Sequence, residues 1–380
     1  MPAAWHPFDV DSSAVYETLH QEGGWHWSEL LQSWVVSDFA TAALILRDHD
    51  RFASDPRRAG IAVPQAALNL QLLDPPIFNS LHRVIVGLLR PPTEHMGLDV
   101  SRGVLDDHFH GLGTKEQFDG MRDLSIPLAV SYMNDILGIA SFDHSDLPEL
   151  ARIITSGMDS MFLPEHELPA RSARRALSKV IAGWIKRSAA DSPLRRSAEA
   201  ARAAGVDDQT FTNSLRAIVL SAYTSLPAAI SAVLFEGATR RADYRSWAHE
   251  GLLAAGREEI LRLHPPFQAT SRFVTGDTVL AGGVLTRGEP ITVLIKAANL
   301  DPAKFKDPYA LDVKRNEGRS LSFGYGVHAC AGATLASALC ELLMNYLARN
   351  NVTLSMVGTP TYAQHATVQM FDSLPLMASV

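Results

Sequence analysis

The 380-residue chain is poor in cysteine, and this excludes one class of fold. Only Cys330 and Cys340 are present, too few for a disulfide framework. If both lie on or beside one helix, ten residues of rise separate them by about 15 Å, beyond disulfide reach. We therefore expect two free thiols in a reducing cytoplasm, one of them available for chemistry.

The chain also lacks basic clusters and long apolar runs. With a formal net charge of -7 and no run of Lys or Arg, it has no electrostatic signature of a nucleic-acid binder. The segment Met1–Val10 carries prolines and an acid where a signal peptide would need a cation followed by an apolar run. No stretch reaches the ~18 uninterrupted apolar residues of a membrane span. These absences predict a cytoplasmic protein without nucleic-acid or membrane partners.

Neither internal repeats nor low-complexity linkers divide the chain, so we expect one domain over residues 1–380. Apolar residues at helical spacing predict helices. These are Asp38–Arg47, Pro148–Met161, Ala170–Ala189, Asp207–Phe235, Tyr244–Leu263 and Ala333–Ala348. Short strands are predicted at Ser33–Ser37, Ala269–Phe273, Thr278–Leu280, Ile291–Ile295 and Val352–Val357. The pattern indicates a mainly α fold with small β-sheets, of the α+β class.

One segment stands out for chemistry. After an aperiodic stretch, Asn299–Arg319, that predicts an ordered loop, residues 323–332 read Phe-Gly-Tyr-Gly-Val-His-Ala-Cys-Ala-Gly and lead into a helix. Two glycines allow a tight turn that lets the backbone approach a flat cofactor closely. A cysteine at a helix start lies near backbone N–H groups that favour its thiolate. A thiolate ligand to haem iron favours O–O cleavage.

Other readings of this segment are possible. A dinucleotide loop needs a third glycine where Ala329 stands, and a zinc site needs about four ligands where His328 and Cys330 supply two. A covalent c-type haem needs a Cys-x-x-Cys-His motif, which is absent. An inert core thiol at Cys330 remains open from these residues alone.

The whole chain resembles the cytochrome P450 superfamily, in particular its soluble bacterial type. The cysteine segment matches at Phe323, Gly324, Gly326, His328, Cys330 and Gly332. Further pieces follow in the family's order. They are Trp34-Val35-Val36, Leu46-Arg47-Asp48, Phe52, Asp74-Pro75-Pro76, Glu259-Ile260-Leu261-Arg262, Pro265-Pro266, Arg272, Ala297 to Pro302 and Arg315.

The resemblance implies a cytochrome P450 fold with haem between a long central helix and the helix after the cysteine loop. It implies non-covalent haem b, with Cys330 as iron ligand and Phe323 and Gly324 in the haem-binding loop. Arg272 and His328 resemble the residues that neutralise the haem propionates. Glu259, Arg262 and Arg315 resemble an ion network behind the cysteine loop, which is structural rather than catalytic.

The chain departs from the family in two helices. Phe78 and His82 stand where a His and an Arg usually face the haem carboxylates, so His82 is the expected propionate contact, with Arg83 as a substitute. In the central helix, Thr224 or Ser225 fills the usual threonine position, but no carboxylate precedes it. Pro227 removes an N–H and is expected to open the helix there, giving a polar notch or only a bend around the substrate.

By resemblance, the protein is a haem-thiolate monooxygenase. It would oxidise a medium-sized, largely apolar organic substrate with dioxygen, in natural-product biosynthesis, using electrons from a separate ferredoxin or flavoprotein. Lys304, Lys306, Lys314 and Arg319 would form a basic docking face, or be merely solvated. One alternative is a peroxide-driven or oxidative-coupling enzyme, since the acid is missing. Another is a haem-binding or substrate-binding protein without turnover.

Overall fold

The computed structural model describes residues 13–90, 98–111, 116–280 and 282–379, so the segment 1–10 discussed above lies outside it. Its α-helices are α1 Ser13–Gln21, α2 Phe39–Arg47, α3 Ile77–Leu89, α4 Leu98–Gly111, α5 Ile126–Leu137, α6 Leu147–Ser156, α7 Glu167–Arg187, α8 Pro193–Ala203, α9 Asp208–Ser221, α10 Ser225–Ala238, α11 Tyr244–Glu250, α12 Leu253–Leu263, α13 Ile295–Asn299 and α14 Ala333–Arg349.

The strands are short and lie mainly toward the two ends of the chain. They are β1 Trp25–Ser28, β2 Ser33–Val36, β3 Phe52–Ala53, β4 Glu116–Asp119, β5 Ala269–Val274, β6 Thr278–Leu280, β7 Gly283–Leu285, β8 Pro290–Leu294, β9 Thr353–Met356, β10 Thr361–Tyr362, β11 Phe371–Ser373 and β12 Pro375–Ser379. The predicted mainly α fold with small sheets is therefore confirmed.

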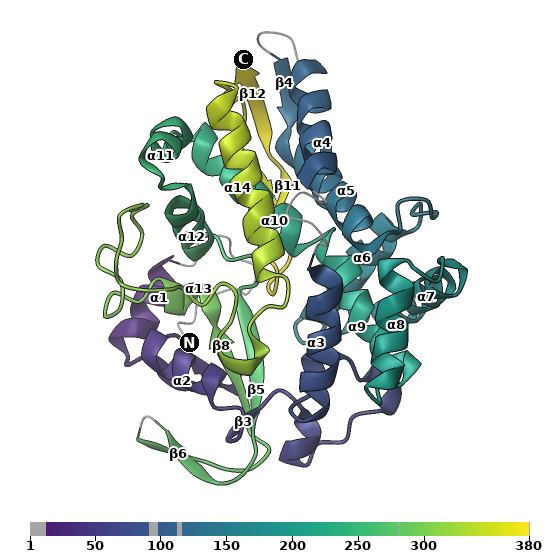
Figure 1. The fold of residues 1–380 in the computed structure, drawn as a ribbon. Coiled ribbons are helices and arrows are strands. Elements are labelled where there is room, and N and C mark those ends of the chain that lie inside the picture. Colours follow the sequence, from purple (N-terminus) through teal and green to yellow (C-terminus); the bar gives the residue numbers. More distant parts are fainter. Residues whose placement is uncertain (1–12, 91–97, 112–115, 281, 380) are drawn as a thin grey trace.

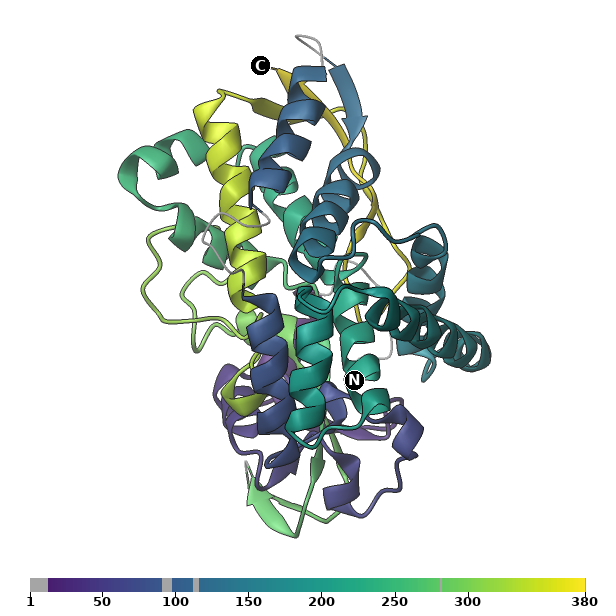
Figure 2. The same ribbon diagram turned by 45° about the vertical axis from the view of Figure 1, so that its right-hand side comes forward.

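Two small sheets mark opposite ends of the molecule, with the helices between them (Figures 1 and 2). At one end, a five-stranded sheet has the order β1-β2-β8-β5-β3, in which β2 and β8 are parallel and the other neighbours antiparallel. At the other end, β12 lies between β4 and β9, antiparallel to both. Each sheet thus joins segments that are far apart in the sequence.

The central helix pair α9 and α10 lies in the main hydrophobic core. In α10, eleven of fourteen residues are buried, and this helix packs against α14, α12 and α5. The stretch Asp208–Ala238 is long and apolar enough to cross a membrane by length and composition, although 72% of its most apolar window is buried in the fold. Its apolar side chains therefore already have protein partners.

Three predicted helices differ from the structure. Asp207–Phe235 is interrupted at residues 222–224, and Tyr244–Leu263 is divided at Gly251, whose φ of 72° ends α11 in the left-handed conformation. The segment Pro148–Met161 leaves the α-helix at Ser156, just before Gly157. There, a Cβ on Gly157 would meet the Cβ of Ala170 at 2.0 Å, so the close approach of α7 requires glycine.

Candidate functional site

The cysteine loop is a tight backbone turn that only glycine satisfies at two positions. Gly324 and Gly326 have φ of 68° and 73°, in the left-handed region. A Cβ on Gly326 would lie 2.6 Å from the carbonyl oxygen of Leu46, so this glycine also allows α2 to approach. The Cys330 N–H donates to the Phe323 carbonyl at 2.8 Å, which closes the loop and connects two of the predicted site residues.

Cys330 lies between this loop and α14, which begins at Ala333. Its side chain is solvent-accessible, yet burial raises the pKa of its thiol, while a hydrogen bond from the backbone of Gly332 opposes the rise. The thiolate that we expected from the helix terminus is therefore not favoured by the protein alone. Because a metal cation deprotonates a coordinating thiol outright, an iron ion would reverse this balance.

Cys340 is a different kind of cysteine. It is fully buried within α14, and burial raises the pKa of its thiol to about 12. It is thus an inert core residue, and both thiols are free, as the sequence predicted.

Arg272 on β5 is a buried cation with no anion to balance it. Its side chain bonds the Thr270 hydroxyl at 3.3 Å and the Ser271 carbonyl at 2.8 Å, and no carboxylate oxygen of the described residues forms an ion pair with it. Burial lowers the pKa of its guanidinium to about 10, although the distant charge of Asp74 opposes this. A buried, uncompensated cation is costly, so the site fits a ligand that carries an anion, as haem propionate does.

His328 does have an anionic partner within the protein. Its Nε2 lies 2.7 Å from Oδ1 of Asp74, and its ring packs edge-on against Phe78 with 4.4 Å between centroids. Asp74 also accepts hydrogen bonds from Arg58 and the Asp55 N–H. Burial alone would raise the pKa of Asp74, but these bonds, led by the one from His328, lower it. His328 is therefore largely shielded from solvent and already paired with a carboxylate, and its contact with a haem propionate stays a prediction.

His82 also contacts Phe78, through ring stacking. Its ring lies 5.0 Å from that of Phe78, nearly parallel to it, and burial together with the charge of His328 lowers its pKa. A neutral imidazole is a weaker partner for carboxylates than guanidinium. His82, Phe78 and His328 thus form one aromatic cluster, which sequence reasoning treated as separate residues.

The ion network behind the cysteine loop has the predicted members. Arg262 donates two hydrogen bonds to Glu259, at 2.7 and 2.8 Å, and Arg315 donates a third at 2.8 Å. Sequence reasoning missed Asn299, whose amide binds Leu321 N–H and the Ser322 hydroxyl just before the loop. Asn299 lies in the Ala-Ala-Asn-Leu-Asp-Pro segment that matched the family, and this match could have marked it as a structural residue. Together these residues fix the irregular segment that precedes Phe323.

The central helix is interrupted at the turn of Tyr223, as the missing N–H of Pro227 predicts. Residues 222–224 are not helical, and Pro227 lies in the first turn of α10, where a missing N–H is tolerated. Among the described residues, no hydrogen bond reaches the carbonyl of Ala222 or Tyr223. Since Pro227 has no N–H for the Tyr223 carbonyl, the proline contributes to the break without lying inside it.

Two hydroxyl groups lie at this break. Thr224 is buried and donates to the Leu220 carbonyl at 2.9 Å. Ser225 is partly exposed, and its hydroxyl has no hydrogen bond within the described part of the chain. Burial raises the pKa of the neighbouring Tyr223 to about 12, so its phenol stays protonated near neutral pH. The break therefore presents hydroxyls and open carbonyls, but the phenol does not replace the missing carboxylate.

Comparison with known proteins finds similarity to one family. The model for the family described as Cytochrome P450 matches residues 226–359. Erythromycin C-12 hydroxylase of Saccharopolyspora erythraea is 27% identical over 322 residues, which cover 82% of this chain and 80% of that protein. Cytochrome P450 monooxygenase PikC of Streptomyces venezuelae is 26% identical over 87% of this chain and 81% of its own length. The crystal structure of CYP109E1 from Bacillus megaterium with testosterone matches at a TM-score of 0.83 and 23% identity, covering 96% of this chain and 97% of that chain.

Proposed function

We infer from these similarities that the chain belongs to the cytochrome P450 family, and from this membership we propose its cofactor contacts, substrate class and electron donor. It is a P450-type monooxygenase that uses haem. We propose that the haem is non-covalent haem b, that Cys330 ligates its iron, and that the protein acts in the cytoplasm. The observation that carries this is the accessible Cys330 thiol beside a tight turn built on Gly324 and Gly326.

Arg272 is the proposed principal contact for the haem propionates. Its support is the buried guanidinium without an ion-pair partner in the described chain. His82 and His328 would contribute more weakly, because His328 already pairs with Asp74 and His82 is a desolvated imidazole. Phe323 and Gly324 would form the wall of the cysteine loop against the ring.

The substrate that we propose is a medium-sized, largely apolar organic molecule from natural-product biosynthesis. Support comes from a relative named for hydroxylating erythromycin, itself a natural product. Haem held by a thiolate supplies the activation of dioxygen. The residues of this chain would deliver protons, and we propose Thr224 and Ser225 at the break between α9 and α10, with the open carbonyls of Ala222 and Tyr223 holding water.

We further propose that a ferredoxin or flavoprotein docks near the cysteine loop. Of the four cations predicted for this face, Lys306, Lys314 and Arg319 are exposed, and Lys306 and Arg319 form no ion pair with the described residues. Lys314 pairs with Glu250 at 3.5 Å, and Lys304 lies over the rings of Phe39 and Phe305. An acidic partner would therefore engage chiefly Lys306 and Arg319.

The absorption spectrum of the reduced, carbon monoxide-bound protein tests the iron ligand. The wild-type chain and Cys340→Ser should both give the spectrum characteristic of thiolate-ligated haem, and Cys330→Ser should lose it. A colourless protein after expression with ample haem, or an unchanged Cys330→Ser spectrum, would refute the assignment.

A peroxide-driven enzyme is the second candidate, favoured by the phenol of Tyr223 in the position of the acid. Product formation with hydrogen peroxide alone would then exceed that with a reductase, ferredoxin and NADPH. The reverse ratio would eliminate this candidate.

A further inference from the structure

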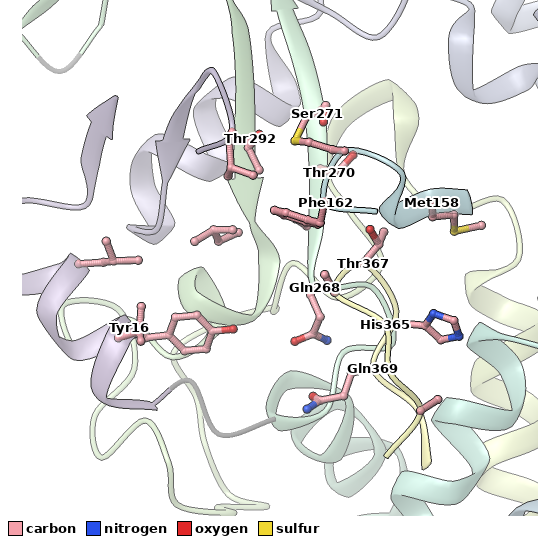
Figure 3. A pocket seen from close by; sticks show the side chains of 18 of the residues that line it. Tyr16, Met158, Phe162, Gln268, Thr270, Ser271, Thr292, His365, Thr367 and Gln369 are labelled. Carbon is pink, nitrogen blue, oxygen red and sulfur yellow. The ribbon is translucent and has the colours of Figure 1, made fainter. Parts of the chain in front are cut away.

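A cavity of about 260 Å³ lies on one side of β5, away from the cysteine loop's own residues. Its walls come from α1, from β5 and β8, from the segment after α6, and from residues 362–369 near the C-terminal end. Figure 3 shows Tyr16 on one side and Met158 on the other, with Thr270, Ser271 and Thr292 on the strands above. The volume is just below the ~300–1,000 Å³ typical of ligand sites, so the cavity holds a small molecule or one end of a larger one.

The lining of this cavity mixes apolar and polar side chains and is almost uncharged. Met158, Met161 and Phe162 supply an apolar wall, and Gln268, Ser271 and Thr292 face them with amide and hydroxyl groups. Gln268 donates to the Pro265 carbonyl at 2.6 Å, and no hydrogen bond within the described residues engages its Oε1. The one titratable imidazole, His365, lies 3.4 Å from the Asp159 carboxylate. Apart from His365 no acidic or basic side chain lines the cavity, and the nearby ammonium of Lys296 already donates to the Oε1 of Gln369 at 2.7 Å. An ionised ligand would thus be desolvated without a charged partner on the wall, whereas hydroxyl or carbonyl groups would find partners.

The inner wall is held together by the buried carboxylate of Asp159. It accepts hydrogen bonds from the Ala366 N–H at 3.1 Å, the Thr367 N–H at 2.9 Å and the Thr367 hydroxyl at 2.7 Å. His365 Nδ1 adds an electrostatic contact that is not aligned as a hydrogen bond. Burial alone would raise the pKa of Asp159, but its partners lower it, so the carboxylate is ionised at neutral pH. The segment after α6 is therefore fastened to residues 365–367, and the cavity is pre-formed.

The cavity also borders the proposed haem site. Thr270 lines it and accepts a hydrogen bond from Arg272, the proposed propionate contact. On the opposite wall, the Gln369 N–H donates to the Pro266 carbonyl at 2.8 Å, and Phe267 pairs with Val368. A molecule held here would lie one side chain away from Arg272.

We propose that this cavity binds the uncharged, hydroxyl-bearing end of an apolar organic molecule, and that Asp159 is a positioning residue that keeps its wall closed. That the occupant is the enzyme's substrate rests on the proposed function. The chemical class of the occupant rests only on the lining. The cavity would therefore select neutral molecules over anionic ones of the same length.

Calorimetric titration of the haem-loaded protein with 1,2-decanediol and with decanoate tests the selectivity. The diol should bind at least about tenfold more tightly than the anion. Ala363→Trp, which fills the cavity, should abolish diol binding, while Ala190→Trp in the exposed loop between α7 and α8 should not change it. Equal binding of the two probes, no binding of the diol, or diol binding that survives Ala363→Trp would overturn the proposal.

The variant Asp159→Asn tests whether the Asp159 carboxylate holds the cavity wall in place. Asparagine keeps one accepting oxygen but turns an NH₂ group toward a backbone N–H, so diol affinity should fall about tenfold. Thr367→Val, which removes one donor, should have a smaller effect in the same direction. Asp143→Asn, with the same charge change in an exposed loop, should have none. Unchanged affinity in both Asp159→Asn and Thr367→Val would overturn the role of Asp159.

The carbon monoxide spectrum separates this proposal from the proposed function. If the wild-type spectrum lacks thiolate ligation but diol selectivity persists, the haem assignment fails and the cavity stands. If the spectrum shows thiolate ligation but the protein does not prefer the diol, the haem assignment stands and the cavity proposal fails. Thr367→Val, the milder change, covers the case in which Asp159→Asn fails to fold.

Discussion

Buried charged residues surround the cysteine loop, and they differ in whether the chain itself neutralises them. Glu259 has two guanidinium partners, and Asp74 has His328 and Arg58, whereas Arg272 has no ion-pair partner among the described residues. The family resemblance predicted the Glu259 network, whereas the spacing of Glu259 and Arg262 on one helix turn was equally compatible with a surface pair. It could not predict the pair of Asp74 and His328, since 254 residues separate them and only the fold brings them together.

Removing the Glu259 charge should destabilise the protein. In Glu259→Gln, the buried Arg262 loses its counter-charge, at a cost of roughly 3 to 5 kcal/mol in the free energy of unfolding. Chemical denaturation of the haem-loaded protein measures this, and Glu149→Gln, in an exposed pair with Arg152, serves as the control without measurable effect. A Glu259→Gln protein as stable as the control would contradict a buried network.

The same carboxylate predicts a pH dependence. Burial alone would raise the pKa of Glu259, but hydrogen bonds from Arg262 and Arg315 lower it below the unfolded value of about 4.3. Its stabilisation is therefore complete above about pH 4.3 and is lost as the pH falls through the folded-state pKa. Unfolding curves between pH 7 and pH 3 should show a steeper acid loss for the wild type than for Glu259→Gln. Parallel curves would show that Glu259 is not the responsible group.

At the scale of the elements, apolar spacing predicted where most long helices lie. It did not predict where tertiary packing interrupts them. Pro227 correctly predicted an interruption of the central helix. The interruption lies at residues 222–224, and Pro227 itself lies in the first turn of α10, where proline is tolerated. The helices α1, α4, α5 and α8 were not among the predicted segments, and α3 was expected only from the family resemblance. Strand β12 was missed as well, because its partners β4 and β9 lie far from it in sequence.

The turn that carries Cys330 depends on Gly326 against α2. In Gly326→Ala, the positive φ and the 2.6 Å approach to the Leu46 carbonyl force α2 and the loop apart. We expect severalfold faster haem loss to apomyoglobin, measured by absorbance. Gly87→Ala on α3, where nothing lies within 4 Å, should leave that rate unchanged and stabilise the helix by about 0.5–1 kcal/mol. Equal haem-loss rates in the two variants would argue against a tight loop.

The break between α9 and α10 predicts the behaviour of Pro227→Ala. Alanine restores an N–H that can bond the Tyr223 carbonyl and close the notch. If the notch serves proton delivery, the fraction of consumed dioxygen released as hydrogen peroxide should rise at least twofold. An unchanged fraction would mean that Pro227 only shapes the helix.

At the scale of the whole molecule, the loop between α13 and α14 lies on the left of Figure 1, on the opposite side from α7. This loop carries the exposed Lys306 and Arg319. Lys306→Glu with Arg319→Glu should raise the KM for an acidic ferredoxin about tenfold and flatten its dependence on ionic strength. Lys179→Glu, on exposed α7, should leave both unchanged. Comparable KM values for the two variants would place docking elsewhere.

The five-stranded sheet interleaves strands from residues 25–53 with strands from residues 269–294. A protease cut in the exposed connection between α7 and α8 would therefore leave two fragments. These fragments would stay associated through the pairing of β2 with β8 and of β3 with β5. Such a nicked protein should migrate as one species until denaturant is added, and separately expressed halves should find each other through these strands.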